Sequence, residues 1–81
     1  MNWGEDKMTP DGVVWFRRVR AALVAKGLDP DAEHAFGLAA GLMFNERAAR
    51  IGCPGLLDSY LEPIARQLGI ELAEVFAVKE S

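Results

Sequence analysis

Residues 9–31, TPDGVVWFRRVRAALVAKGLDPD, decide the fold class of this chain. The stretch opens with a threonine that can cap a helix, a proline suited to the first turn and an acid that favours the helix N-terminus. Apolar residues then recur at helical spacing and form a stripe that we expect to be buried: Trp15, Phe16, Val19, Ala22 and Leu23. The helix should stop at Gly27, and Asp29-Pro30-Asp31 starts a second helix at once, so these two helices should be neighbours.

The rest of the 81-residue chain has the same helical character. Twelve Ala and nine Leu stand against six Val, three Ile and one Thr, and no segment alternates apolar and polar residues over the length of a strand. The length suits one small domain. We therefore predict an all-α protein, a compact bundle of four or five helices, with a flexible arm at residues 1–12, a single helical domain at residues 13–78 and a tail at residues 79–81.

The second predicted helix contains two glycines that need an explanation. Its expected buried face consists of Ala32, Ala35, Phe36, Ala39, Leu42 and Met43. Gly37 and Gly41 would each cost about 1 kcal/mol relative to alanine inside a helix. Three explanations stay open: close packing within the domain, a smooth groove where a partner helix docks against Phe44, or a break in the helix. Asn45 is a candidate cap for a separate short helix over residues 46–51.

The C-terminal half should hold two more helices after a turn at residues 52–55. The residues expected to be buried in the longer one are Leu56, Leu57, Tyr60, Leu61, Ile64, Ala65 and Leu68. Pro63 complicates its start. Either Ser59 and Glu62 form a capping box just ahead of the proline, or a kinked helix begins near Leu56. A final short helix is predicted around residues 72–76.

Residues 61–76, LEPIARQLGIELAEVF, resemble the last two helices of the lambda-repressor-like, or XRE-type, helix-turn-helix family. That family often ends L-x-x-I-A-x-x-L-G-V-S-x-x-E-L-F. Residues 17–28 are similar to its first helix with the closing Gly-Leu, and residues 38–42 resemble the segment that enters its turn. The resemblance implies a helix-turn-helix-like core and a DNA-reading helix at residues 43–51, with Asn45, Arg47 and Arg50 facing the bases.

The distribution of charge favours a different function. Residues 13–27 carry a net charge of +4, whereas residues 28–46 carry −4. A DNA-binding protein needs several phosphate contacts around its reading helix, and here the basic residues belong to the first helix. We therefore expect a non-enzymatic regulator that binds a partner protein, with a sequence-specific DNA-binding repressor as the alternative. Arginines and large apolar residues dominate interface energetics, so the expected contacts are Arg17, Arg20, Val24 and Phe44.

The size and the acidic net charge of this chain are also similar to those of small antiactivators of quorum-sensing-controlled conjugative transfer. That similarity implies a bacterial or mobile-element regulator of transcription whose partner is a transcription activator. A homodimer is left open.

The chain has few residues that could carry catalysis or bind a metal ion. His34 and Cys53 are the only residues of their types, and the chain has two Ser and one Thr. No nucleophile with a base and an orienting group can be assembled from this set, and no zinc site, so we expect neither an enzyme nor a cofactor. No stretch is apolar enough to span a bilayer, and a single thiol suits the reducing cytoplasm, which is the expected location.

Overall fold

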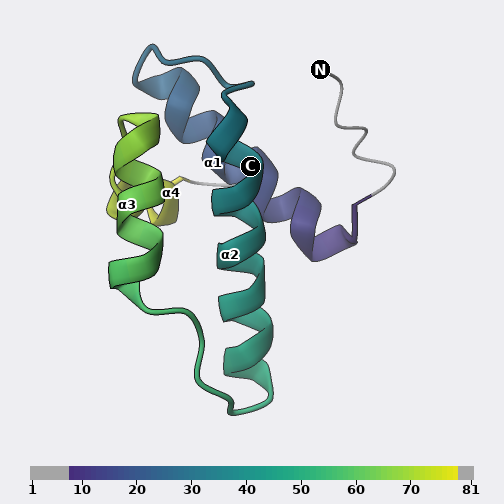
Figure 1. Ribbon diagram of the computed structural model, residues 1–81. Coiled ribbons are helices and arrows are strands. Elements are labelled where there is room, and N and C mark those ends of the chain that lie inside the picture. Colours follow the sequence, from purple (N-terminus) through teal and green to yellow (C-terminus); the bar gives the residue numbers. More distant parts are fainter. Residues whose placement is uncertain (1–7, 79–81) are drawn as a thin grey trace.

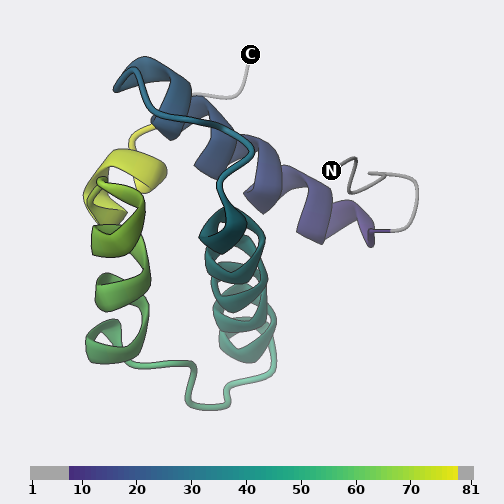
Figure 2. The same cartoon turned by 45° about the horizontal axis from the view of Figure 1, so that its top comes forward.

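The computed structural model describes residues 8–78, which form an all-α bundle of four helices. These are α1 (Pro10–Ala25), α2 (Glu33–Arg50), α3 (Asp58–Leu68) and α4 (Leu72–Phe76). Helices α2 and α3 run antiparallel side by side, α1 packs across α2, and α4 contacts α1 and α3 (Figures 1 and 2). The predicted fold class, a small all-α bundle of four or five helices, is confirmed.

Helix α1 begins and ends on the predicted signals. Thr9 caps it, with its hydroxyl accepting a hydrogen bond from the Gly12 N–H at 3.4 Å. At the other end Gly27 has φ +76°, which suits glycine, and the Leu28 N–H donates to the Leu23 carbonyl at 2.8 Å. All five residues of the predicted stripe are buried. The stripe along α1 therefore forms one wall of the core.

The domain starts earlier than predicted. Residues 8–12 were assigned to the arm, but α1 already begins at Pro10 and the Met8 side chain packs against the core. The Thr9 cap explains this earlier start, because it stabilises the first turn of α1 and makes residues 10–12 part of the helix. The remaining arm residues, 1–7, and the predicted tail, 79–81, lie outside the described residues.

Helix α2 is continuous, so the prediction of a separate helix over residues 46–51 is wrong. Its eighteen residues run without interruption from Glu33 to Arg50, which also excludes a break at the glycines. The Asn45 side chain caps nothing in its own helix and bonds instead to the following loop. The buried face is also rotated from the prediction, since Leu38 is fully buried and Phe36 is 39% exposed.

The two glycines of α2 have different surroundings. A Cβ atom added to Gly41 would lie 2.6 Å from Cδ2 of Leu61 on α3, whereas one added to Gly37 would meet nothing within 4 Å. Close packing within the domain therefore explains Gly41, which lets α3 approach α2. It does not explain Gly37.

Of the two predicted starts of α3, the one near Leu56 is close to the observed start, whereas the capping box at Ser59 is wrong. Helix α3 begins at Asp58 after Leu57, so Ser59 is not its cap and Leu56 precedes the helix. Pro63 lies inside the helix at an exposed position, where water can hydrate the carbonyl that the proline leaves unbonded. Three residues expected to be buried are instead exposed: Leu56, Leu57 and Tyr60. The predicted short helix at residues 72–76 is confirmed as α4.

Contacts with α1 hold α4 in place. The rings of Trp15 and Phe76 meet edge to face with their centroids 5.9 Å apart. Arg18 lies over the Trp15 ring at 4.7 Å and donates a hydrogen bond to the Phe76 carbonyl at 2.8 Å. Val75 is fully buried beside them. These contacts use the side of α1 that faces the bundle and leave its opposite side uncovered by the described residues.

Candidate interaction surfaces

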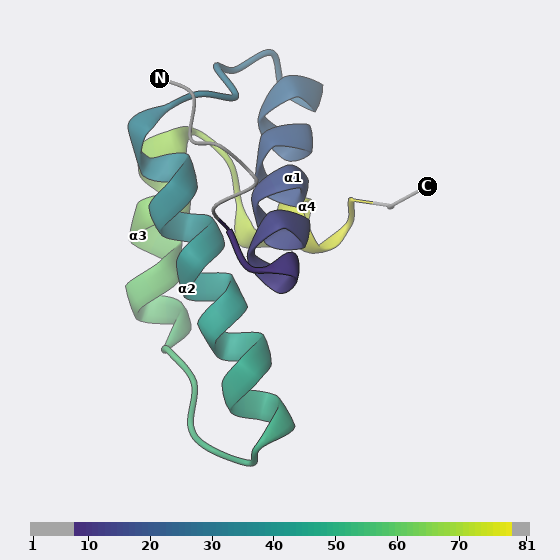
Figure 3. The ribbon, with the colours of Figure 1, turned by 90° about the vertical axis from the view of Figure 1, so that its right-hand side faces the viewer.

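The outer side of α1 carries two of the predicted partner contacts, Arg17 and Val24. Residues 14, 17, 21 and 24 recur at helical spacing, and all four are exposed. We call these residues, Val14, Arg17, Ala21 and Val24, the α1 face. Helix α1, which carries it, lies along one side of the bundle, as Figure 3 shows. Residues 12–28 contain no acidic residue, so this face combines small apolar side chains with positive charge.

Arg20, the third predicted contact on α1, is engaged within the protein. Its Nη2 atom lies 3.3 Å from Oδ1 of Asp31, and its guanidinium group lies over the Phe16 ring at 5.6 Å. The arginine side chain is still 39% exposed, and an exposed ion pair of this kind contributes at most about 1 kcal/mol. Arg20 therefore fastens the turn between α1 and α2 and borders the α1 face.

Phe44, the fourth predicted contact, lies on a different surface. On α2 it shares the side of Gly41, which faces α3, whereas the neighbouring Met43 points toward Gly12 at the start of α1. Phe44 belongs to a group of exposed apolar residues that we call the apolar end: Phe44, Ile51, Leu56, Leu57 and Tyr60. This group covers the last turns of α2, the loop at residues 51–57 and the first turn of α3, at the lower end of Figure 1.

The three residues predicted to face DNA all make contacts within the protein. Asn45 holds the loop with both atoms of its amide group: Nδ2 donates to the Leu56 carbonyl at 3.3 Å, and Oδ1 accepts the Leu56 N–H. Arg50 donates to Glu46, one turn earlier on α2, at 2.7 Å. Both side chains thus stabilise the end of α2 and the loop after it.

Arg47 forms the most extensive of these contacts. It grips the Asp11 carboxylate with two hydrogen bonds, from Nε at 2.6 Å and from Nη2 at 2.9 Å, and reaches the Thr9 hydroxyl at 3.0 Å. The hydrogen bonds from Arg47 and Thr9 hold the pKa of the Asp11 carboxyl well below its usual range. This clamp joins the first turn of α1 to α2. Sequence reasoning missed Asp11 as a partner because 36 residues separate it from Arg47 and no local pattern connects them.

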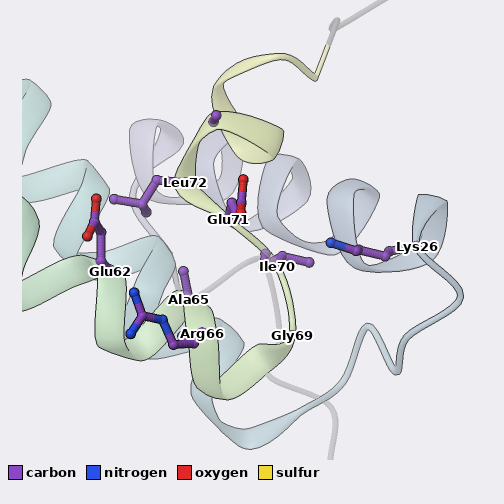
Figure 4. A pocket seen from close by; sticks show the side chains of 9 residues that line it. Lys26, Glu62, Ala65, Arg66, Gly69, Ile70, Glu71 and Leu72 are labelled. Atoms are coloured by element: carbon purple, nitrogen blue, oxygen red, sulfur yellow. The ribbon is translucent and has the colours of Figure 1, made fainter.

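Three cavities open on the surface of the described residues. One of about 530 Å³ lies between the end of α1, α3 and α4 and is shown in Figure 4. Its charged lining is balanced, with Lys26 and Arg66 facing Glu62 and Glu71, and Lys26 also pairs with Glu74 at 2.8 Å. None of its described lining residues is a histidine, cysteine or hydroxyl side chain. A second cavity, of about 410 Å³, lies between the end of α1 and α4.

The third cavity, about 210 Å³, is apolar and lies where the start of α1 meets α2. Its lining includes Phe16, Phe36 and Met43. Throughout residues 8–78, no three side chains of His, Cys, Asp or Glu gather in a way that could hold a metal ion. Over the same range each helix is too short or too polar to cross a bilayer.

Comparison with known proteins found no relative. No family model matches the chain, and neither a curated protein nor a solved structure matches it.

Proposed function

We propose that this protein is a non-enzymatic, cytoplasmic regulator associated with transcription, and that it binds an acidic amphipathic helix of a partner protein on the α1 face. The observation that carries the proposal is the composition of that face. Val14 and Val24 are 38% and 60% exposed, and Arg17 and Ala21 lie between them on the same side of the helix. Such a stripe suits the apolar side of a partner helix that carries acidic residues along its edge.

The overall charge distribution supports an acidic partner. The whole chain carries −3 and residues 13–27 carry +4, so the other residues sum to −7. An acidic helix is therefore attracted to α1 and repelled by the rest of the molecule. Electrostatic complementarity of this kind sets the orientation and speed of association more than the final affinity.

DNA binding is the weaker candidate. Asn45, Arg47 and Arg50 would each have to leave an internal partner before reaching a base or phosphate. The Arg47 clamp is the costliest to release, because it would leave the Asp11 carboxylate without its charge-assisted hydrogen bonds.

Site-specific photo-crosslinking in the source cell tests the proposal. A photoreactive phenylalanine analogue replaces Val24, and a matched control places it at Gln67, an exposed residue of α3. We expect one discrete protein adduct from position 24, absent from position 67 and lost when Arg17→Glu is added. Equal adducts from both positions would refute the α1 face as the binding surface.

A DNA selection tests the alternative with the purified protein. The probe is a random-sequence duplex pool at about 0.15 M salt, near physiological ionic strength. We expect no sequence to be enriched. Enrichment of one sequence that Arg47→Ala and Arg50→Ala together abolish would establish the repressor instead.

A further inference from the structure

We infer that the apolar end joins two copies of this chain in a two-fold dimer. Its spine is the side of α2 that carries Phe44 and Ala48 and that Ile51, the residue after the helix, continues at intervals of three or four residues. Gly41 lies on the same side nearer the middle of the helix, where α3 covers it. Leu56 lies beside this spine, since its Cδ1 atom would be 3.4 Å from a Cβ added to Gly41. Leu57, directly before α3, and Tyr60, on its first turn, are also exposed apolar residues of this end.

The exposed area is large for a protein of this size. Ile51 and Leu57 are 75% and 72% exposed, and Tyr60 and Phe44 are 60% and 56% exposed. Together with Leu56 they present roughly 500 Å² of surface, at the upper range of the largest patch on a typical monomer. Covering this patch on two copies removes about 1,000 Å² from water, which is the lower limit for a specific interface.

The zero net charge of this region favours binding of a second copy over binding of a strongly charged partner. Residues 37–60 contain two arginines, one glutamate and one aspartate, so their net charge is zero. Arg50 is paired with Glu46, and Arg47 is paired with Asp11. A two-fold interface brings the same patch of both protomers together, and a patch without net charge does not repel its own copy. A strongly acidic or basic helix would gain no electrostatic attraction there.

Ala48 gives the interface room for close approach. It lies between Phe44 and Ile51 on the spine, so in an antiparallel crossing the Phe44 ring of one protomer packs over Ala48 of its partner. This interface goes beyond the proposed function, because it uses the apolar end and leaves the α1 faces of both protomers open to partners.

Sedimentation equilibrium of the full chain tests the inference over about 1 to 500 µM, the range of modest association constants. We expect a monomer–dimer equilibrium. Ile51→Lys and Leu57→Lys each place two like charges in the interface, and each should raise the dimer dissociation constant at least tenfold. Val24→Lys, at a valine that is 60% exposed on the α1 face, is the matched control and should leave the dimer dissociation constant unchanged. Circular dichroism confirms that each variant keeps its helical content.

Two results would overturn the inference. One is a wild-type chain that stays monomeric up to the highest concentration. That result would mean that the apolar end does not bind a second copy. The other is an equal effect of all three lysine substitutions, which would reflect net charge alone. Failure here leaves the crosslinks from position 24 intact, so the two proposals are tested separately.

Discussion

Replacing the two glycines of α2 by alanine in turn should have effects of opposite sign. Both positions lie inside the same helix, and alanine is favoured over glycine there by about 0.8–1 kcal/mol. At Gly37 an added Cβ meets nothing within 4 Å, so the full gain should be realised. At Gly41 the new atom would lie 2.6 Å from Cδ2 of Leu61, which is only 1% exposed and has little room to move.

The magnitude at each site follows from these surroundings. Forcing an extra carbon into a packed core typically costs about 1–3 kcal/mol, which equals or exceeds the helix gain. Gly41→Ala should therefore change the free energy of unfolding by between about 0 and −2 kcal/mol, whereas Gly37→Ala should raise it by about 1 kcal/mol. For a domain of this size, 1 kcal/mol corresponds to a melting shift of about 4–8 °C.

Urea denaturation followed by circular dichroism measures both variants, and a double substitution tests the cause. In a Leu61→Ala background the clash partner is gone, so Gly41→Ala should become stabilising, as at Gly37. Leu61→Ala itself should lower the free energy of unfolding by about 2–5 kcal/mol. The effect of Gly41→Ala in this background is therefore compared at urea concentrations near each variant's denaturation midpoint. If Gly37→Ala and Gly41→Ala stabilise equally, or if the Leu61 background changes nothing, the packing argument for Gly41 is refuted.

Two further predictions concern the polar contacts. Because the Asp11 pKa is lowered in the folded state, its contribution to stability is complete above about pH 5 and is lost as the pH falls through the acid range. Asp11→Asn should therefore flatten the fall in melting temperature between about pH 5 and pH 2, and a calorimetric profile as steep as that of the wild type would contradict the clamp. Asn45→Ala removes both hydrogen bonds to Leu56 and should cost about 1 kcal/mol. Amide exchange at residues 52–57 should speed up several-fold, while Arg50→Ala, which breaks only an exposed ion pair, should change it little; equal rates in the two variants would argue against the loop contact.

The sequence predicted those parts of the fold that depend on neighbouring residues. The start of α1 could be predicted because Thr9 and Pro10 act within one turn of the helix that they begin. The buried stripe of α1 followed from its spacing, and the left-handed Gly27 ended the helix where glycine was expected. These signals act between neighbouring residues, so they can be interpreted without knowing how the rest of the chain folds.

The errors have more than one cause: at Asn45 a distant contact overrode a local signal, and in the C-terminal half the apolar pattern misplaced the start of α3. Asn45 has the chemistry of a helix cap, but its amide bonds to Leu56 eleven residues away and α2 continues past it. Leu57 and Tyr60 were expected to be buried because they fit a helical apolar pattern, yet α3 starts only at Asp58 and turns them outward. Of the predicted site residues, Arg17 and Val24 share one surface, and Phe44 lies on another.

The length of α2 connects these errors to the proposed dimer. At 1.5 Å per residue its eighteen residues extend about 27 Å, whereas the eleven residues of α3 beside it extend about 16 Å. The last turns of α2 therefore project beyond α3, as Figure 1 shows, and apolar side chains there have little of the bundle to pack against. An unsupported helix end normally frays. Here Arg47 ties it to α1 and Asn45 ties the following loop back to it. The polar residues that the family resemblance assigned to DNA thus hold Phe44 and Ile51 in a fixed, solvent-facing arrangement, and a fixed apolar surface is what a second protomer requires.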